Sequence, residues 1–442
     1  MKILFISLGC DKNLADSEEM LGLLTAGGHE ITDDETQADA IVINTCCFIK
    51  DAKEESVETI LEMAEYKKTG SCHALIVTGC MAQRYQKEII EEVPEVDAVL
   101  GTTSYGDIVK ALEEAVAGNH FEEFRDIDYL PDTGSKRVLT TGGHFGYLKI
   151  AEGCDKHCTY CIIPKLRGKF RSVPMERLIA QAEDMAEQGV KELILVAQET
   201  TLYGMDLYGK KELPRLLHEL AQIPGIYWIR ILYCYPEEIT DELIDAIAAE
   251  PKVCNYLDIP IQHASDNVLK RMGRRTDQAE LRAIIGKLRE KIPDICLRTT
   301  LISGFPGETQ EDFEELYRFV NEMEFDRLGV FPYSQEEDTP AATMEDQVPQ
   351  EVKEFRRDEL MELQQAIAFD KAEDMVGRIL TVMIEGKVAD EETYVARTYR
   401  DAPNVDGYLF VNTSANLMTG DFVKVLVTDS NEYDLIGEIY HE

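Results

Sequence analysis

The first 117 residues alternate short apolar runs with stretches of helical periodicity. Four apolar runs have the length of buried strands: Ile3–Leu8, Ala40–Asn44, Ala74–Thr78 and Asp97–Leu100. Each is followed by a stretch with helical spacing of its apolar positions: Ser17–Thr25, Asp51–Tyr66, Gln83–Glu92 and Ser104–Val116. Such alternation is typical of an α/β fold with a parallel sheet covered on both faces. We therefore predict a doubly wound parallel sheet for residues 1–117.

A second series of strands and helices follows a polar segment rich in glycine, which we predict to be a linker at residues 118–143. Six runs are strand-like: Phe145–Ala151, Glu192–Ala197, Tyr227–Tyr233, Tyr256–Ile259, Cys296–Ile302 and Arg327–Pro332. Helical patterns lie between and after them: Met175–Gln188, Glu280–Lys291, Gln310–Met323 and Val352–Asp374. Six such units are fewer than a closed TIM barrel has. We predict an open (β/α)6 partial barrel over residues 144–372.

The tail of the chain has a different pattern, with short β-rich runs between turn signals such as Asp406-Gly407. The runs are Ile379–Glu385, Thr393–Thr398, Gly407–Val411, Phe422–Thr428 and Leu435–Tyr440. Closely spaced strands of this kind indicate a small antiparallel β-barrel. We predict this barrel for residues 373–442.

Charge and cysteine content restrict the classes of function. The chain has 45 basic and 84 acidic residues, a net charge of −39, so it suits a basic partner better than bare nucleic acid. No apolar run reaches the roughly 18 residues that span a bilayer, and Ile3–Leu8 is short for a secretion signal. We expect a cytoplasmic protein with no membrane partner. In that setting, 11 cysteines indicate metal binding or catalysis rather than disulfides.

Three cysteines lie close together after the first barrel strand, at Cys154, Cys158 and Cys161. Active sites of βα barrels form at that end of the strands. Three thiolates can hold three irons of a [4Fe–4S] cluster, which normally has four cysteine ligands, and the next cysteine is only Cys234. One iron would then stay open for a substrate. A zinc site, with His157 as a further ligand, is the competing interpretation.

Three other cysteines each follow the end of an apolar run in the first domain: Cys10, Cys46 and Cys80. Because the carboxyl ends of parallel strands line one crevice, a single sheet can bring these thiols to one edge. We expect a second cluster there, again with an open iron. Cys47 is the rival ligand. The remaining cysteines read as core residues: Cys72, Cys234, Cys254 and Cys296.

The spacing Cys154-x-x-x-Cys158-x-x-Cys161, with Tyr160 before the last cysteine, resembles the signature of the radical S-adenosylmethionine superfamily. The resemblance implies that the open iron binds S-adenosylmethionine, whose reductive cleavage yields a 5′-deoxyadenosyl radical. It also implies cofactor contacts from Tyr160, Gln198, Glu199, Gly304, Phe305, Pro306, Gly307 and Glu308. We expect the two glycines of that loop to let the backbone approach the nucleoside.

The segments Leu8–Asn13, Asn44-Thr45-Cys46 and Thr78-Gly79-Cys80, together with a TRAM-like tail, resemble the methylthiotransferase family across nearly the whole chain. The resemblance implies two [4Fe–4S] clusters and two molecules of S-adenosylmethionine. One molecule methylates sulfur at the auxiliary cluster, and the other generates the radical that abstracts hydrogen from the substrate. The implied partners include an electron donor such as flavodoxin or ferredoxin and a sulfur carrier.

The substrate branch of this family is suggested by charge and by local sequence. Residues 376–442 carry five Lys and Arg against twelve Asp and Glu, whereas a tail that grips tRNA should be basic. An acidic barrel complements a basic ribosomal protein. Asn44–Ser56, Val196–Gly204 and Asp401–Gly407 resemble the RimO-type branch, which modifies the β carbon of an aspartate in ribosomal protein S-twelve. A tRNA adenosine methylthiotransferase and a non-catalytic iron–sulfur electron carrier are the alternatives.

Three further polar residues fall within or beside strand patterns. Arg230 and Arg298 either meet a carboxylate of cofactor or substrate inside the barrel or form structural salt bridges. His263 follows the fourth barrel strand, where it either contacts a ligand or is a satisfied loop histidine.

Overall fold

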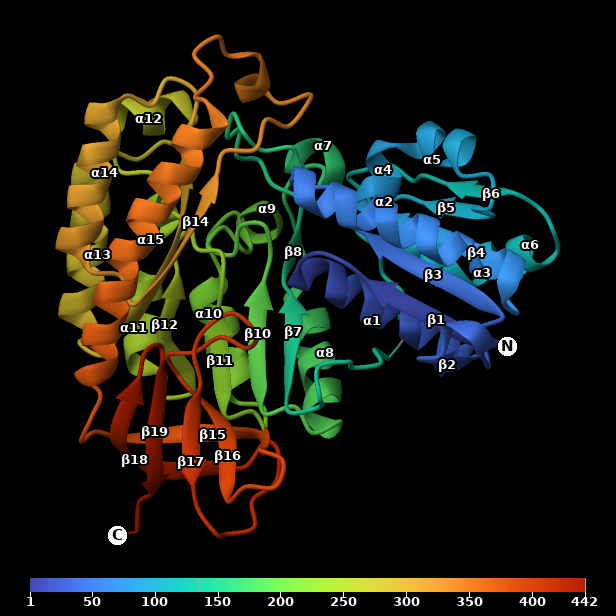
Figure 1. The fold of residues 1–442 in the computed structure, drawn as a ribbon. Helices are drawn as coiled ribbons and strands as arrows, with labels where there is room; N and C mark the ends of the chain where they lie inside the picture. Colours follow the sequence, from blue (N-terminus) through green and yellow to red (C-terminus); the bar gives the residue numbers. More distant parts are fainter. Residues whose placement is uncertain (135, 442) are drawn as a thin grey trace.

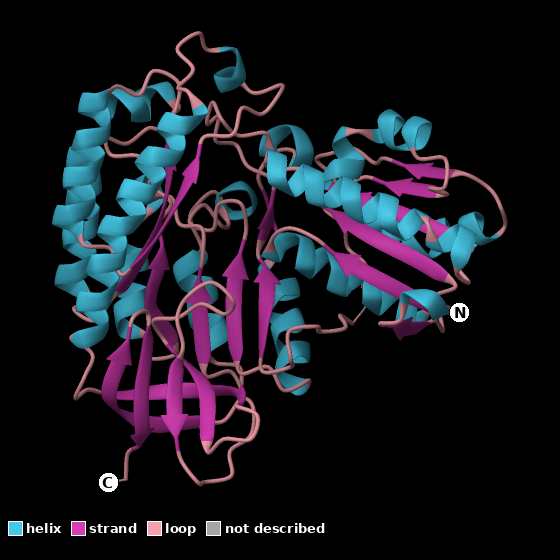
Figure 2. Ribbon diagram, in the orientation of Figure 1, coloured by secondary structure: helices cyan, strands magenta, loops and turns pink. Residues whose placement is uncertain are grey.

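The computed structural model describes residues 1–134 and 136–441, which contain three large sheets of different construction and one short two-stranded sheet. A parallel sheet of six strands lies beside an open parallel barrel, and a small closed barrel lies beneath the latter (Figures 1 and 2). The predicted fold class is therefore confirmed. Within the described residues, no helix has both the length and the apolar character needed to cross a membrane.

The N-terminal sheet has the strand order β2-β1-β3-β4-β5-β6, all parallel. Its strands are β1 Lys2–Ser7, β2 Glu30–Thr32, β3 Ala40–Thr45, β4 Ala74–Gly79, β5 Ala98–Leu100 and β6 Phe121–Glu123. Its helices are α1 Asp11–Ala26, α2 Lys50–Ala64, α3 Tyr66–Thr69, α4 Cys80–Arg84, α5 Gln86–Glu92 and α6 Ile108–Val116. Ile41 and Val42, neighbours on β3, pack into different cores, so both faces are covered as predicted.

The segment predicted as a linker is more ordered than expected. Residues Phe121–Glu123 form β6, which pairs with β5, so the prediction of an irregular segment is wrong there. Strands of three half-exposed residues lack the apolar run that a sequence pattern detects. Further along, Arg137 donates hydrogen bonds to Glu18 of α1 (2.5 Å) and to the Tyr147 carbonyl (2.8 Å). The connection between the first two sheets is therefore fixed to both.

The central barrel is a six-stranded parallel sheet that does not close, with the order β14-β13-β12-β11-β10-β7. Its strands are β7 Phe145–Lys149, β10 Glu192–Val196, β11 Trp228–Ile231, β12 Val253–Asp258, β13 Cys296–Ser303 and β14 Arg327–Pro332, and a short pair, β8 Ala151–Glu152 and β9 Arg171–Ser172, follows β7. Its helices are α7 Ile163–Arg167, α8 Met175–Glu187, α9 Met205–Tyr208, α10 Leu213–Ala221, α11 Asp241–Ala249, α12 Asp266–Arg271, α13 Gln278–Lys291, α14 Gln310–Met323 and α15 Gln350–Glu373.

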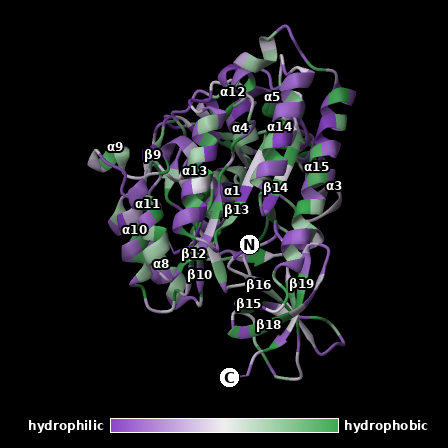
Figure 3. Cartoon of the chain, turned by 90° about the vertical axis from the view of Figure 1, so that its left-hand side faces the viewer, coloured by the Kyte–Doolittle hydropathy of each residue, from purple (hydrophilic) through white to green (hydrophobic). Residues whose placement is uncertain are grey.

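The outer face of this barrel is covered by amphipathic helices. Leu193 and Leu195 of β10 and Leu297 of β13 belong to one large core with residues of α8, α13 and α14. In Figure 3, hydrophilic and hydrophobic residues alternate along these helices, as expected of amphipathic helices. The two free edges of the barrel, β7 and β14, therefore leave the open side as the lateral way into its interior.

The C-terminal barrel is closed by five strands in the order β15-β16-β17-β19-β18. They are β15 Ile379–Lys387, β16 Thr393–Thr398, β17 Leu409–Asn412, β18 Phe422–Asn431 and β19 Asp434–Ile439. Four of the pairings are antiparallel as predicted, but β17 pairs with β19 in parallel. The difference arises because β19 forms a hairpin with β18 and so returns alongside β17 in the same direction.

A buried set of charged side chains attaches this small barrel to the amino ends of the central strands. Glu192 of β10 accepts hydrogen bonds from Arg230 (2.7 Å) and from Arg397 of β16 (2.7 Å), and Arg397 also donates to Glu385 of β15 (2.6 Å). Arg230 donates as well to the carbonyl of Tyr399 (2.7 Å). Of the two roles expected for Arg230, the structure shows the structural salt bridge.

We predict that Arg397→Met destabilises the protein by about 3–5 kcal/mol, because it breaks two buried ion pairs and leaves Glu192 with Arg230 and Glu385 with His144 as their remaining partners. The free energy of unfolding in urea measures this. Lys68→Met is the control, because Lys68 pairs with Glu65 at the surface and its loss should cost less than about 1 kcal/mol. Equal effects of the two substitutions would contradict the structural role given to Arg397.

Candidate active site between two sets of cysteines

The three strand-end cysteines of the first sheet lie at one edge. The register pairs Ser7 with Asn44 and Thr45 with Gly79, so β1, β3 and β4 end level with one another. Cys46 directly follows β3, and Cys80 directly follows β4 as the first residue of α4. A Cβ added to Gly9 would lie 2.9 Å from the Cys46 sulfur, which places the Cys10 loop against Cys46. The structure thus brings the three cysteines together.

Burial keeps the thiols of Cys46 and Cys80 protonated in the protein alone. Burial, with the neighbouring Cys80 and Cys10, raises the pKa of Cys46 to about 12. Cys80 is also buried, which raises its pKa, whereas Cys10 is exposed. Metal ions bind cysteine as thiolate and so supply the charge that this edge lacks. The donor set therefore fits an iron–sulfur cluster better than it fits three free thiolates.

Asn13 of α1 ties the three strand ends together, a role that the sequence did not reveal. Its side-chain amide donates to the carbonyls of Leu8 and Thr45, both at 3.0 Å, and its oxygen lies 3.9 Å from the Cys80 sulfur. The same oxygen accepts a hydrogen bond from Arg167. A single buried side chain thus spans the ends of β1, β3 and β4.

The backbone at Gly79 makes the turn into Cys80 possible. Gly79 has φ +94°, and a Cβ there would lie 2.3 Å from the side-chain oxygen of Asn44. Only glycine adopts this conformation readily and leaves that space. The tight turn places Cys80 at the first position of α4, next to the end of its strand.

The other cysteines lie in apolar surroundings. Cys47, the rival ligand, is fully buried in the N-terminal core, and Cys72 lies in the same core, where its thiol donates to the Ala74 carbonyl (3.3 Å). Cys254 and Cys296 pack inside the barrel near its floor, which is the end formed by the amino ends of the strands. Cys234 packs in the core between the barrel strands and the surrounding helices.

The second set of cysteines occupies the loop after β8. Cys154 and Cys158 are buried and Cys161 is half-buried. Burial, with a smaller contribution from the nearby Cys158, raises the pKa of Cys154 to about 12. The Cys158 sulfur lies 3.4 Å from the hydroxyl of Tyr235, which follows β11. The loop therefore presents three cysteine sulfurs next to the barrel mouth.

Within the described residues, no three His, Cys, Asp or Glu side chains converge on a point where they could hold one metal ion. A single zinc ion requires such convergence. In a [4Fe–4S] cluster, by contrast, each thiolate binds its own iron, so the sulfur atoms are spread around a larger group.

The loop Gly304-Phe305-Pro306-Gly307-Glu308 is held mainly by the protein itself. The Phe305 ring packs edge-on against Tyr160 (6.3 Å between ring centres) and Tyr333 (5.3 Å). A Cβ on Gly304 would lie 2.3 Å from Lys353, and one on Gly307 would lie 2.3 Å from Arg271. A side chain at either position would collide with Lys353 or Arg271, so glycine is required there by the protein's own packing, and the expected approach of the backbone to the nucleoside stays a prediction.

Glu308 forms a hydrogen bond within the same loop, and His263 lies close to Glu308. The Glu308 carboxylate accepts hydrogen bonds from the Phe305 backbone (3.0 Å) and from Arg356 (2.8 Å), and it lies 3.6 Å from His263 Nε2. His263 accepts a hydrogen bond from the Ser265 backbone at Nδ1 (2.9 Å). Nδ1 of His263 is thus satisfied, but its buried Nε2 has no hydrogen-bond partner among the described residues, so both expected roles of His263 stay open.

Gln198 and Glu199 offer buried acceptor atoms without donors. Gln198 donates to Glu152 (3.1 Å), which leaves its own oxygen without a hydrogen-bond partner. One carboxylate oxygen of Glu199 accepts from the Thr201 backbone (3.0 Å), and the other has no hydrogen-bond partner. Burial raises the pKa of Glu199 to about 7. Unpaired buried acceptors near Cys154 fit a cationic donor such as the amino group of S-adenosylmethionine.

A buried group of four charged residues joins the two sets of cysteines. Arg167 donates to Asp16 (2.7 Å) and Glu152 (3.2 Å), and Lys149 donates to Glu152 (2.8 Å) and also contacts Asp16. Because Arg167 also reaches Asn13 and Glu152 also accepts from Gln198, the contacts run without a break from the Cys80 edge to the barrel mouth. Sequence reasoning missed this group, although Lys149 and Glu152 are conspicuous as charges at the end of an apolar strand.

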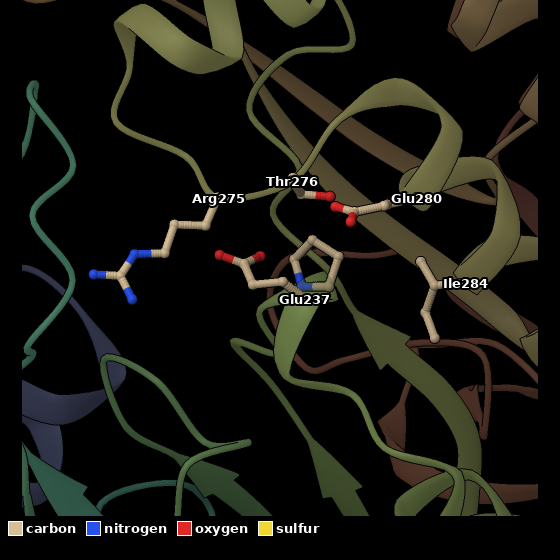
Figure 4. Close-up of a pocket in the computed structure, with 6 residues that line it drawn as sticks. Glu237, Arg275, Thr276, Glu280 and Ile284 are labelled. Carbon is tan, nitrogen blue, oxygen red and sulfur yellow. The ribbon is translucent and has the colours of Figure 1, made fainter.

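A separate polar cavity of 280 Å³ lies on the barrel rim between η3 (Pro236–Glu238) and α13. Glu237, Arg275, Thr276, Glu280 and Ile284 line it (Figure 4), and Arg275 extends away from the other side chains. None of the cysteines or expected cofactor residues contributes to this lining.

Three known protein families match successive parts of the chain. The uncharacterized protein family UPF0004 matches residues 2–101, the radical SAM superfamily matches residues 148–320, and the TRAM domain matches residues 376–439. The first range covers β1 to β5 of the N-terminal sheet, the second covers most of the open barrel but not β14, and the third covers nearly all of the closed barrel.

Curated relatives match over the full length. A protein named ribosomal protein uS12 methylthiotransferase RimO from Lachnoclostridium phytofermentans is 65% identical over 437 residues, which is 99% of each chain. The chain belongs to the RimO family. Family members from Acetivibrio thermocellus and Clostridioides difficile are 50% and 48% identical, and both cover 100% of this chain and 99% of their own.

Solved structures with a similar fold have distant sequences. The radical S-adenosylmethionine methyltransferase TsrM from Kitasatospora setae aligns with a TM-score of 0.54 at 14% identity, covering 77% of this RimO-family chain and 76% of its own. The cobalamin-dependent radical enzyme OxsB aligns with a TM-score of 0.52 at 15% identity, covering 83% and 56%. At such identities the likeness concerns the fold alone.

The raised pKa of Glu199 predicts a pH effect on stability. Its folded-state pKa of about 7 lies above the ordinary 4.5. The free energy of unfolding therefore falls as the pH rises from 4.5 to 7, and the loss stays constant at higher pH. The free energy of unfolding of wild type relative to Glu199→Gln should therefore fall by about 3 kcal/mol between pH 4.5 and 8. Urea denaturation of cluster-free protein at several pH values measures this difference, and a constant difference would contradict the burial of an ionisable Glu199.

Proposed function

We propose that this RimO-family chain transfers a methylthio group to the β carbon of an aspartate in ribosomal protein uS12, the S-twelve protein. The curated relatives carry the name of this uS12 activity at 48–65% identity over their full length. One observation in the structure carries the proposal. The buried contacts Cys80–Asn13–Arg167–Glu152–Gln198 join the two cysteine sets, as a reaction that uses both would need.

The proposed cofactors are two [4Fe–4S] clusters and S-adenosylmethionine. Cys154, Cys158 and Cys161 would hold one cluster, and Cys10, Cys46 and Cys80 would hold the other. When bound, these groups supply the 5′-deoxyadenosyl radical and a site for the sulfur that is transferred. We assign residues 1–117 to the auxiliary-cluster domain, 144–372 to the radical domain and 373–442 to the TRAM domain.

The chain's own residues bind and orient the reactants in this proposal. The unpaired oxygens of Gln198 and Glu199 accept hydrogen bonds from the amino group of S-adenosylmethionine. Tyr160 and Phe305, which pack edge-on, shield the same region from water. The ionised form of Glu199, which burial disfavours, becomes favourable once a cation lies beside it.

The remaining partners follow from the chemistry. Radical formation consumes one electron, so we infer an electron donor such as flavodoxin or ferredoxin, and sulfur transfer requires a sulfur carrier. Because the substrate is a ribosomal protein, the reaction belongs in the cytoplasm, with uS12 either free or within the small subunit.

The two sets of cysteines should fail in different ways when changed. With reconstituted protein, a reductant and uS12, Cys80→Ala should abolish methylthiolation but keep some formation of 5′-deoxyadenosine, whereas Cys158→Ala should abolish both. Mass spectrometry of uS12 and chromatography of the nucleoside measure the two products. Cys254→Ala, which alters a buried cysteine outside both sets, is the control and should keep both activities.

The same experiment separates the alternatives. Methylthio groups on tRNA adenosine with unmodified uS12 would contradict the proposed substrate. Formation of neither product by protein with intact clusters would favour an electron carrier. Full methylthiolation by the Cys80→Ala protein would exclude a second cluster at this edge.

A further inference from the structure

The interior of the open barrel has a solvent-accessible wall formed by β13 and β14. Leu297, Thr299 and Leu301 of β13 are fully buried, whereas the alternate residues are partly exposed. The partly exposed residues are Arg298, Thr300 and Ile302. On β14, which is a free edge, Phe331 is 54% exposed. Because strand side chains alternate between faces, these positions line the barrel interior beside its open side.

Nearly every cation near the barrel floor is engaged by a carboxylate. Arg230 and Arg397 share Glu192, Arg327 donates to Asp401 (2.5 Å), and Arg400 donates to Asp326 (2.7 Å). These pairs attach the C-terminal barrel and occupy the charge of each of these cations.

Arg298 differs from these cations. Its nearest carboxylate oxygen is Oδ1 of Asp406, at 4.0 Å, which is beyond hydrogen-bonding distance, while Oδ2 of the same carboxylate accepts hydrogen bonds from Tyr256 (2.8 Å) and from the Ala402 backbone (2.8 Å). About a quarter of its side chain, 26%, remains exposed. Burial lowers the pKa of Arg298, but Tyr256, Asp258 and Asp406 nearby outweigh this and raise it above the usual value.

The position of Arg298 relates it to both cysteine sets. The strand registers place Arg298 at the same level as Val196 of β10. Gln198 lies two residues further along the chain from Val196, so Arg298 is about 7 Å nearer the amino ends of the strands than Gln198 is. The adjoining Asp258 accepts a hydrogen bond from the Tyr233 backbone (3.0 Å). The Tyr233 ring in turn lies 3.5 Å from the Lys12 ammonium group, and its hydroxyl lies 3.3 Å from Asp11. Arg298 is thus one layer of side chains from the Cys10 loop.

We propose that Arg298 binds the side-chain carboxylate of the substrate aspartate, an inference that rests on the proposed function. A guanidinium group pairs with a carboxylate through two parallel hydrogen bonds, which fixes the orientation of the bound group. The β carbon is bonded directly to that carboxylate. Binding at Arg298 therefore holds the β carbon inside the barrel, between the level of Gln198 and the Tyr233–Lys12 contact with the Cys10 loop.

The charges around Arg298 suit this task. Asp258 and Asp406 keep the guanidinium charged, but the hydrogen bonds that they accept come from Tyr233, Tyr256 and Ala402. Among the described residues, the Arg298 guanidinium has no side-chain hydrogen-bond acceptor. A substrate carboxylate that enters from the open side thus meets a charged group whose N–H donors are available. An asparagine at the same position offers a neutral amide, so this site distinguishes the two side chains.

Equilibrium binding of full-length uS12 and of its Asp→Asn form at the target position tests the assignment. The full chain is used with and without reconstituted clusters, and fluorescence anisotropy gives both dissociation constants. Wild type should bind the aspartate form about 10- to 100-fold more tightly than the asparagine form. Arg298→Gln should reduce this ratio to about one, and Arg298→Lys should restore part of it.

Arg318→Gln is the matched control, because Arg318 is an exposed arginine on α14. It should bind both forms of uS12 as wild type does. In turnover experiments, Arg298→Gln should raise the KM for uS12 more than it lowers kcat and should keep cleavage of S-adenosylmethionine without substrate. A purely structural residue would lower every activity together.

The outcomes separate the inference from the proposed function. If wild type methylthiolates uS12 but Arg298→Gln keeps the full preference for aspartate, the inference is overturned and the function stands. Equal binding of both uS12 forms by wild type overturns it in the same way. If wild type neither binds nor modifies uS12, the proposed function and the inference fail together.

Discussion

Asp16, Lys149, Glu152 and Arg167 are buried together where the first helix of the N-terminal sheet meets the first strand of the open barrel. Two cations and two anions removed from water are stable only when every partner is in place. The arrangement of the two domains is therefore fixed closely, because sliding one against the other would separate these charges. The relation between the two cysteine sets depends on this group, since Arg167 also supports Asn13 on one side and Glu152 supports Gln198 on the other.

At the amino ends of the central strands, buried ion pairs fix the small C-terminal barrel to the open barrel in the same way. The small barrel covers the amino ends of the central strands through Glu192, Arg230 and Arg397, and its Met383 packs among the residues of the barrel interior. Because this end is covered, we expect a protein loop to enter from the side between β7 and β14, which do not pair with each other. The acidic tail accordingly contributes to structure through its buried ion pairs as well as to the overall charge of −39.

The sequence predicted most of the fold because buried parallel strands are apolar throughout, as β3 shows: it was predicted over Ala40–Asn44 and spans Ala40–Thr45, with every residue buried. It failed for β6, whose three residues carry no such signal, and for the parallel pairing of β17, which depends on the path of the chain. It placed the cysteines at the correct strand ends. It could not find Asn13 or Arg167, because their partners are brought together only by packing between domains.

The central claim is that one chain holds two separate iron–sulfur clusters on two sets of three cysteines. The most direct test is the iron and sulfide content of anaerobically reconstituted protein, with Mössbauer spectra to identify the cluster type. With two [4Fe–4S] clusters, we expect about eight irons and eight sulfides per wild-type chain. We expect about four of each when one set of three cysteines, either Cys10, Cys46 and Cys80 or Cys154, Cys158 and Cys161, is changed to alanine. Wild-type protein with only four irons, unchanged by the substitutions at Cys10, Cys46 and Cys80, would contradict the central claim.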